Sequence, residues 1–195
     1  MKAPLTARDL AQVAVFAALI AVLGWLGTLY PFGAVVPITA QTLGVMLAGS
    51  ILGPWRGLLA VAAFQALVLA GLPLLAGGRG GLGVYTGPTA GFLIGWLAGV
   101  VVIGLLAGPA LRGAVETSGR SRTLVPVLLA ANAIGGIAAI YAFGVPVLAA
   151  RTHVSLGKAL TGSAVYLPGD TIKVVVAAVV TAAVVRGYPK AIAGR

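Results

Sequence analysis

The stretch from Pro88 to Ala107 reads PTAGFLIGWLAGVVVIGLLA and contains no charged side chain. A helix that crosses the hydrocarbon core of a bilayer needs roughly 20 mainly apolar residues, and this stretch has that length. Glycines recur every fourth residue up to and through it, at Gly83, Gly87, Gly91, Gly95 and Gly99. On a helix these glycines form a smooth ridge that a neighbouring backbone or a ligand can approach closely. The stretch predicts a membrane helix, with tight packing favoured for the inner part of the ridge.

The whole chain of 195 residues has the same apolar character. Hydrophobic side chains make up 60% of it, 8% of residues are charged, and the only acids are Asp9, Glu116 and Asp170; the mean hydropathy is +1.10. An ordinary globular domain is about a quarter charged, so this chain lacks the polar groups for a water-soluble surface. Disordered chains are polar and are excluded as well. The composition therefore predicts an integral membrane protein.

Apolar runs bounded by proline or by charge predict an all-α protein with six transmembrane helices in a single membrane domain, residues 1–195. Proline is tolerated at helix ends and stops a helix elsewhere. The expected helices are about 10–29, 37–52, 55–72, 88–107, 124–148 and 170–186. The first run is too long for the core of a signal peptide and no cleavage site follows it, so we expect a retained helix.

The basic residues predict the orientation. With the N-terminus inside, nine of the 13 basic residues are cytoplasmic: Lys2, Arg8, Arg56, Arg112, Arg120, Arg122, Arg186, Lys190 and Arg195. The positive-inside rule therefore favours cytoplasmic placement of both termini. The four outer cations are Arg79, Arg151, Lys158 and Lys173, and some of these are expected to have a further role. The basic residues behind the net charge of +10 are scattered between apolar runs. They therefore indicate the orientation in the membrane, and we expect no nucleic-acid partner.

Residues 72–83 form a short outer loop that reads LPLLAGGRGGLG. Glycines such as Gly78 and Gly80 allow a backbone to approach a ligand, and exposed N–H groups can bind an anion. Arg79 adds a guanidinium fork that suits a carboxylate. The alternative is a flexible loop whose arginine contacts lipid headgroups. A dinucleotide site is excluded, because the loop follows a membrane helix instead of a strand.

The sixth expected helix begins with PGDTIK, residues 168–173. Asp170 and Lys173 are three residues apart, so they share one helix face and can pair. The helix dipole favours an aspartate at this end without any ligand. It does not account for Lys173, which precedes a purely apolar run from Val174 to Val180. A polar ligand flanked by both groups would account for the pair.

Other residues leave two interpretations open. Gln41 and Asn132 either hydrogen-bond a neighbouring helix or line a cavity. Tyr85 is either an interfacial anchor or a cavity wall. Ala14 and Ala18 form a small-residue face on the first helix, which packs internally or docks another membrane protein. With one histidine and no cysteine, the chain is poorly equipped for catalysis, and we expect neither an enzyme nor a cofactor.

The chain resembles the BioY family, the biotin-binding S components of energy-coupling factor (ECF) vitamin transporters. The resemblance covers nearly the whole chain. It rests on the following segments and on their order between the hydrophobic spans: PITAQTLGVMLAG at 37–49, GLP at 71–73, GGRGG at 77–81, GPTAGF at 87–92 and PGDTIK at 168–173.

This resemblance implies a six-helix S-component bundle in the bacterial plasma membrane with a biotin pocket near its outer face. It also implies a membrane coupling (T) subunit and ABC-type ATPases as partners, and the chain itself has no Walker A loop. Ala14 and Ala18 are expected to contact the coupling subunit.

The resemblance and the chemistry of the residues together assign a set of biotin-binding residues. Asp170 is expected to accept from the ureido N–H groups. Lys173 donates to the ureido oxygen or pairs with the carboxylate, and Arg79 with Gly78 and Gly80 clamps the carboxylate or covers the pocket. Gln41, Asn132 and Tyr85 complete the set.

Other functions remain open at this point. One is an S component for a different small carboxylated vitamin. Another is a membrane enzyme that acts on a lipid, with Asp170 as acid or base, although the outer side has no second carboxylate and the chain has a single histidine. The third is a purely structural bundle.

Overall fold

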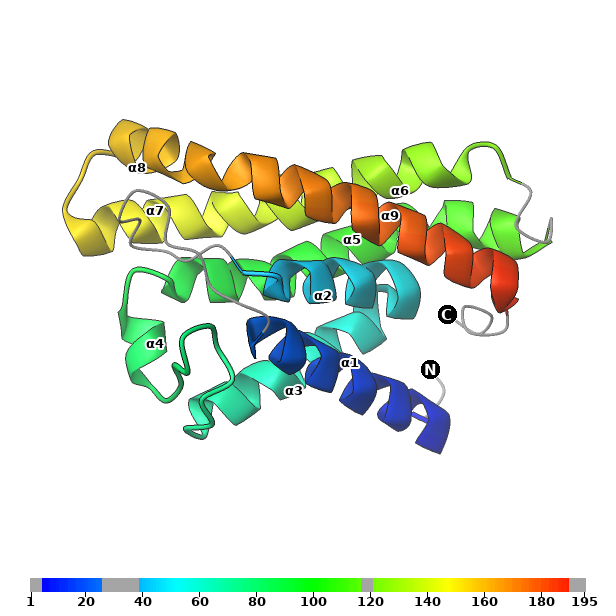
Figure 1. Ribbon diagram of the computed structural model, residues 1–195, viewed down its shortest axis with the longest axis horizontal. Coiled ribbons are helices and arrows are strands. Elements are labelled where there is room, and N and C mark those ends of the chain that lie inside the picture. The colour runs from blue at the N-terminus through cyan, green and yellow to red at the C-terminus, as the bar shows by residue number, and fades with distance from the viewer. Residues whose placement is uncertain (1–4, 26–38, 117–120, 190–195) are drawn as a thin grey trace.

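The computed structural model describes residues 5–25, 39–116 and 121–189, and within these ranges the chain is helical, without a β-sheet. In chain order its elements are α1 (Ala7–Trp25), α2 (Gln41–Leu47), η2 (Ala48–Leu52), α3 (Gly53–Leu69), α4 (Gly83–Thr86), α5 (Ala90–Glu116), α6 (Leu124–Ala133), η3 (Ile134–Ala139), α7 (Ile140–Thr152), α8 (Leu156–Ser163), η4 (Ala164–Tyr166) and α9 (Leu167–Gly187). The all-α prediction is confirmed. Figure 1 shows the long helices running side by side along the molecule.

Five helical segments of the described chain are long and apolar enough to cross a membrane: 7–25, 41–69, 90–116, 124–152 and 156–187. The second segment contains two of the expected helices. A break at Gly53, whose φ is +82°, separates α2 and η2 from α3, which turns back along the molecule (Figure 1). Residues 26–29 and 37–38 of the expected first and second helices lie outside the described residues.

Two helix boundaries differ clearly from the expectation. We expected the sixth helix to begin at about residue 170, but its helical segment begins at Leu156 with α8 and continues through η4 into α9. We expected the fourth helix to end near Ala107, but α5 continues through Pro109 to Glu116. A proline inside a helix removes one backbone hydrogen bond. Here the extra turns bury Leu111 and Ala114 in a cluster with Leu124 of α6. Burial of these side chains outweighs the local cost of the proline. The sequence pattern alone did not show that α6 would pack against this part of α5.

The glycine ridge of α5 is the main packing surface. A Cβ atom on Gly95 would lie 2.7 Å from the carbonyl oxygen of Ile140, and one on Gly99 would lie 2.5 Å from that of Gly135. The backbones of α7 and η3 therefore lie directly against α5. The packing expected for the inner ridge is confirmed, whereas Gly83 and Gly87 lie before α5 and do not extend the ridge as one helix.

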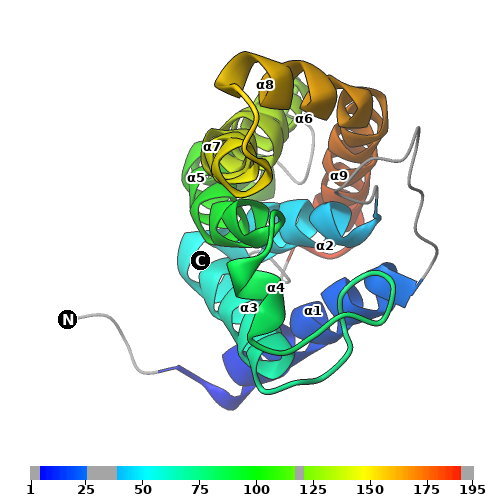
Figure 2. The ribbon, with the colours of Figure 1, turned by 90° about the vertical axis from the view of Figure 1, so that its left-hand side faces the viewer.

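α2 lies in the middle of the bundle. It packs against α1, α5 and α9, and Figure 2 shows it between α5 and α9 with α1 on its other side. Because of this position, the side chain of Gln41 at the start of α2 is 1% exposed. The first residue of this short helix is thereby buried between its neighbours.

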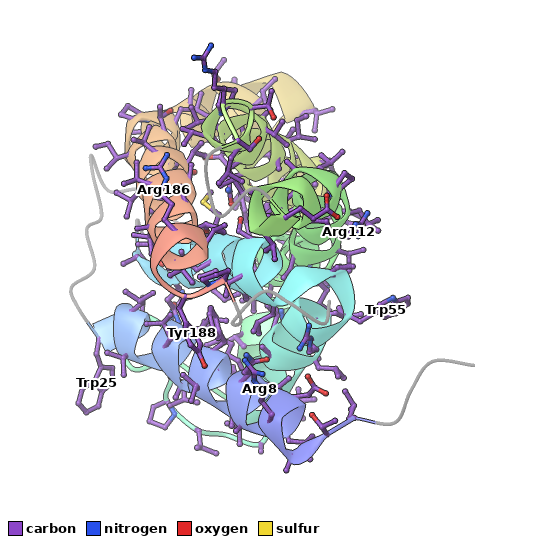
Figure 3. The ribbon with its side chains drawn as sticks, turned by 90° about the vertical axis from the view of Figure 1, so that its right-hand side faces the viewer. Arg8, Trp25, Trp55, Arg112, Arg186 and Tyr188 are labelled. Carbon is purple, nitrogen blue, oxygen red and sulfur yellow. The ribbon has the colours of Figure 1, made fainter. Side chains whose placement is uncertain are left out.

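The start of α1 and the end of α9 lie at the same end of the bundle (Figure 1). Arg8, Arg112 and Arg186 gather at this end, on three different helices (Figure 3). This placement agrees with the orientation that the positive-inside rule predicts. We call this the cytoplasmic end and the opposite end the outer end.

We predict that Gly95→Ala lowers the thermal stability of the protein. The new methyl group would meet the Ile140 backbone at 2.7–2.9 Å, so α7 must move away. Overpacking of this kind typically costs about 1–3 kcal/mol. The melting temperature in detergent would report the loss. Gly108→Ala is the matched control, because its Cβ meets only the end of the Arg112 side chain, at 3.7 Å; an equal loss in both variants would contradict the packing argument.

Candidate functional site

A cavity lies at the outer end of the bundle, where α2, α5, α7 and α9 meet the segment between α3 and α4. Its volume is about 80 Å³. It is lined by Thr39, Gln41, Thr42, Leu75, Ala76, Arg79, Thr89, Phe92, Leu93, Trp96, Gly136, Ile140, Tyr141, Tyr166, Asp170 and Lys173. Most of this wall is apolar, and a few polar groups converge on it, as in ordinary small-molecule sites. Four of the residues selected from the sequence line it: Arg79, Asp170, Lys173 and Gln41.

Asp170 is the centre of a buried polar cluster. It lies in the first turn of α9 and is 6% exposed. The Nζ atom of Lys173 donates to Oδ1 at 2.8 Å, and the hydroxyl of Tyr141 donates to Oδ2 at 2.7 Å. Each carboxylate oxygen thus has one donor, which satisfies the charge that burial would otherwise penalise. The pairing of Asp170 with Lys173 follows from their spacing in the sequence.

Tyr141 belongs to this cluster, and the sequence analysis missed it. It comes from α7, 29 residues before Asp170, and no local spacing relates the two. The Tyr141 ring also meets the Phe92 ring edge-on, with centroids 5.9 Å apart. The close packing of α7 on α5 carries Tyr141 to this position. A polar aromatic residue in an apolar span was the available signal.

The cluster offers both acceptors and donors to a ligand. A carboxylate has about four lone-pair sites, and a lysine ammonium has three N–H donors. One donor contact is recorded on each oxygen of Asp170, and one acceptor for the ammonium of Lys173. The free lone pairs of Asp170 and the free N–H groups of Lys173 can therefore bind a ligand group that carries both N–H and C=O.

Gln41 fixes the wall of the cavity. Its Nε2 atom donates to the carbonyl oxygens of Ile20, at 3.3 Å, and Leu74, at 3.1 Å. Its Oε1 atom accepts from the backbone N–H of Ala76 at 3.3 Å. One amide therefore links α1, α2 and the segment before α4. The sequence left two alternatives open for Gln41, and both apply: its side chain hydrogen-bonds a neighbouring helix and also lines the cavity.

Arg79 closes a tight outer turn. Leu75 and Arg79 exchange backbone hydrogen bonds of 3.0 and 3.2 Å, and Gly77 and Gly78 between them have φ values of +75° and +68°. Only glycine adopts this left-handed conformation without strain. The turn directs the half-buried Arg79 side chain to the cavity, where its Nε donates to the carbonyl oxygen of Ala76 at 3.2 Å.

Gly78 and Gly80 shape this turn and do not line the cavity. A side chain on Gly80 would collide with the carbonyl oxygen of Leu72, so the two segments approach closely there. The backbone N–H of Arg79 is bonded to Leu75, which leaves it unavailable for the anion-binding nest considered from the sequence. The expected contact of Gly78 and Gly80 with a ligand stays a prediction.

Asn132 and Tyr85 lie outside the residues that line the cavity. The Asn132 amide donates to Ser50 Oγ at 3.0 Å and to the carbonyl oxygen of Leu128 at 2.8 Å, which links α6 to η2. The Tyr85 hydroxyl donates to the carbonyl oxygen of Gln65 at 3.2 Å, and burial raises the pKa of this phenol. Both side chains make packing hydrogen bonds in this structure, and their predicted ligand contacts stay predictions.

The aromatic wall is the second feature that the sequence analysis did not identify. Phe92 and Trp96 are four residues apart on α5, hence on one face of this helix, and both are buried. Trp96 packs on Phe64, with ring centroids 6.0 Å apart. The four-residue spacing of Phe92 and Trp96 is visible in the sequence, but aromatic residues that face lipid show the same spacing, so it does not identify a cavity wall. This wall suits a flat apolar ring system.

Ala14 and Ala18 lie on the outward face of α1. Both are exposed, whereas Ala17 and Ile20 on the opposite face are buried in the bundle. Trp25 at the end of α1 also projects outward, as Figure 3 shows. The small-residue face is therefore available to another membrane protein, which is one of the two alternatives that the sequence left open.

Comparisons with known proteins agree on one family. The BioY family model matches residues 1–190. The chain is 48% identical to the biotin transporter BioY of Rhizobium etli, an alignment that covers 95% of this chain and 97% of the relative. It is 45% identical to that of Rhodobacter capsulatus, with 96% and 98% covered. Among solved structures it is similar to the S-component for biotin from an ECF-type ABC transporter, with a TM-score of 0.80, 30% identity and coverage of 93% and 94%.

Proposed function

The chain belongs to the BioY family, and from this premise we propose that its outer cavity is the biotin-binding site and that Asp170, Lys173, Tyr141 and Arg79 bind the vitamin. The protein is the substrate-binding membrane subunit of a biotin uptake transporter, in a bacterial membrane that it crosses several times. It is a transporter subunit and not an enzyme. The alternative of a lipid-modifying enzyme is therefore set aside.

The chemistry of biotin matches the arrangement of the cavity. Its ureido group carries two N–H donors next to one carbonyl acceptor, its ring system and valeryl chain are apolar, and its tail ends in a carboxylate. In our proposal the ureido group contacts the cluster of Asp170 and Lys173, which offers an acceptor next to a donor 2.8 Å away. Phe92 and Trp96 then cover the apolar rings.

The pairing of charges decides which end of biotin lies at which cation. Lys173 is already neutralised by Asp170, and the only other ion pair among the described residues joins Arg56 to Asp9. Arg79 therefore lines the cavity without an acidic partner. An unpaired guanidinium binds a carboxylate strongly, often through two parallel hydrogen bonds. This observation carries the proposal that Arg79 takes the biotin carboxylate.

Tyr141 acts in this proposal as a positioning residue for Asp170. Its hydroxyl occupies one side of Oδ2 at 2.7 Å, while Lys173 occupies Oδ1. The carboxylate is thereby held in one orientation, and its remaining lone pairs face the cavity. Such preorganisation improves affinity, because the ligand does not have to order the side chain on binding.

Energy for uptake comes from other subunits in this proposal. We propose that a membrane coupling subunit contacts the outward face of α1 and that ABC-type ATPases supply the energy. Ala14 and Ala18 are exposed there, and small residues let a partner helix approach closely. The remaining apolar sides of the bundle face the lipid bilayer in this proposal.

We predict that substitutions in the polar cluster weaken biotin binding. Asp170→Asn should raise the Kd roughly 10- to 100-fold, the range expected for loss of hydrogen bonds to a charged group. Tyr141→Phe should raise it about 5- to 10-fold, because Asp170 stays but loses one donor. Isothermal titration with biotin in detergent measures both. Arg151→Gln is the control, since this exposed cation ends α7 outside the cavity; the proposal fails if wild-type protein binds no biotin or if Arg151→Gln equals Asp170→Asn.

A second prediction concerns the carboxylate. Wild-type protein should bind biotin more tightly than biotin amide, by roughly tenfold or more, because the amide cannot form a charged pair with Arg79. Arg79→Gln should bind the two ligands with similar affinity. Competition titrations with both ligands give the ratio for each variant. An unchanged preference for biotin in Arg79→Gln would assign the carboxylate to another group.

A third prediction separates capture from transport. Ala18→Trp should leave the Kd for biotin unchanged and reduce biotin uptake by cells at least about tenfold, because a bulky ring holds a partner helix away. Ile94→Trp on α5 is the control for a bulky residue on an exposed position. Equal uptake by Ala18→Trp and wild-type protein would place the partner on another face.

A further inference from the structure

A second cavity lies at the cytoplasmic end, between the start of α3 and the last turns of α5. Its volume is about 230 Å³, and the residues that matter for its chemistry are Trp55, Arg56, Gly104, Leu105, Gly108 and Arg112. Figure 3 shows Trp55 and Arg112 on the same flank of the molecule. This cavity is at the opposite end from the biotin site and takes no part in the function described above.

The hollow exists because α5 carries two glycines where α3 begins. A Cβ on Gly104 would collide with the backbone of Gly53 and Pro54, so the two helices touch there and close the floor of the cavity. One turn later, a Cβ on Gly108 would meet only Nη1 of Arg112, at 3.7 Å. The guanidinium of Arg112 therefore lies beside open space.

The two arginines at this cavity differ in their pairing. Arg56 is neutralised by Asp9, with Nη1 and Oδ1 2.7 Å apart. Arg112 belongs to neither of the two ion pairs found in the part of the chain that the structure describes. Glu116 lies one turn further along α5 and is exposed, without an ion pair to Arg112 in this structure. The cavity consequently has a net positive charge at its rim.

The surroundings of the cavity indicate the source of an anion. Trp55 and Leu105 are both 60% exposed. Tryptophan is enriched at the membrane–water interface, and an exposed leucine on a membrane helix faces lipid chains. The cavity therefore has an apolar side toward the hydrocarbon and a cationic side toward the cytoplasmic headgroups. Basic pockets of this kind on the cytoplasmic side of membrane helices bind anionic lipid headgroups.

We propose that this cavity binds one anionic phospholipid of the cytoplasmic leaflet. The lipid phosphate contacts Arg112 in the space over Gly108, Trp55 flanks the headgroup, and an acyl chain follows Leu105 along α5. The cavity is lined by residues of α5 and of the η2–α3 junction, so a bound lipid bridges these two parts of the bundle.

Native mass spectrometry of the detergent-purified protein with added phosphatidylglycerol or phosphatidylcholine tests this site. Wild-type protein should retain phosphatidylglycerol in preference to phosphatidylcholine. Arg112→Gln should lower the affinity for phosphatidylglycerol about fivefold, the effect of one arginine near an anionic surface. Gly108→Leu, which fills the hollow but keeps the arginine, should lower it as well. Arg186→Gln, an exposed arginine at the same end on α9, is the charge-matched control, and biotin titration verifies that each variant is folded.

Three results would overturn the proposal. The first is a failure of the Arg112→Gln comparison. Either Arg112→Gln retains phosphatidylglycerol as well as wild-type protein does, or Arg186→Gln loses as much as Arg112→Gln, which would indicate an effect of general surface charge. The second is binding of added inorganic phosphate without a preference between the two lipids, which would make the site one for free anions. The third is unchanged lipid binding together with loss of assembly with the transport partners in Arg112→Gln, which would make the occupant a protein.

Discussion

Direct contact between helix backbones is the constraint on which the rest of this structure depends. α5 has glycine at three successive turns, and a Cβ on Gly91, Gly95 or Gly99 would meet a backbone carbonyl oxygen of α7 or η3 as its nearest atom. In lipid there is no hydrophobic driving force between apolar helices, so this van der Waals packing is what holds them together. The same pair of helices forms part of the outer cavity, because Phe92 and Trp96 of α5 and Tyr141 of α7 line it.

The pairing of charged side chains is the second feature that organises this structure. A charged group in an apolar bundle is costly unless it is paired, and both ion pairs of the described chain follow this rule: Arg56 with Asp9 at the cytoplasmic end, and Lys173 with Asp170 at the outer end. Against this background two arginines without an acidic partner become informative. Arg79 lines the outer cavity and Arg112 lines the cytoplasmic one. In both proposed sites an unpaired guanidinium beside a cavity binds an anion.

Sequence reasoning succeeded for residues whose partners are close along the chain and failed where the partner came from elsewhere. Asp170 and Lys173 are one helical turn apart, so their pairing could be predicted. Tyr141 joins them from another helix, and no sequence spacing predicts this contact. Asn132 is a residue for which the sequence left two alternatives open. A polar side chain in an apolar span points to a cavity or to a neighbouring helix, and the choice depends on which helix lies next to it; for Asn132 that neighbour is η2, through Ser50.

The sequence by itself determined that this is an all-α membrane protein, which end carries the positive charge, and that Arg79, Asp170 and Lys173 are the polar groups of interest at the outer end. These conclusions depend on composition and on local spacing, which are properties of the chain before it folds. Only the tertiary structure decided that α2 lies at the centre of the bundle, that Gln41 links three segments, that Tyr141 supports Asp170, and that a second cavity opens beside Arg112. The physical reason is that burial and hydrogen bonding depend on which helices become neighbours, and in a bundle of uniformly apolar helices this is selected by small differences in side-chain size along their faces.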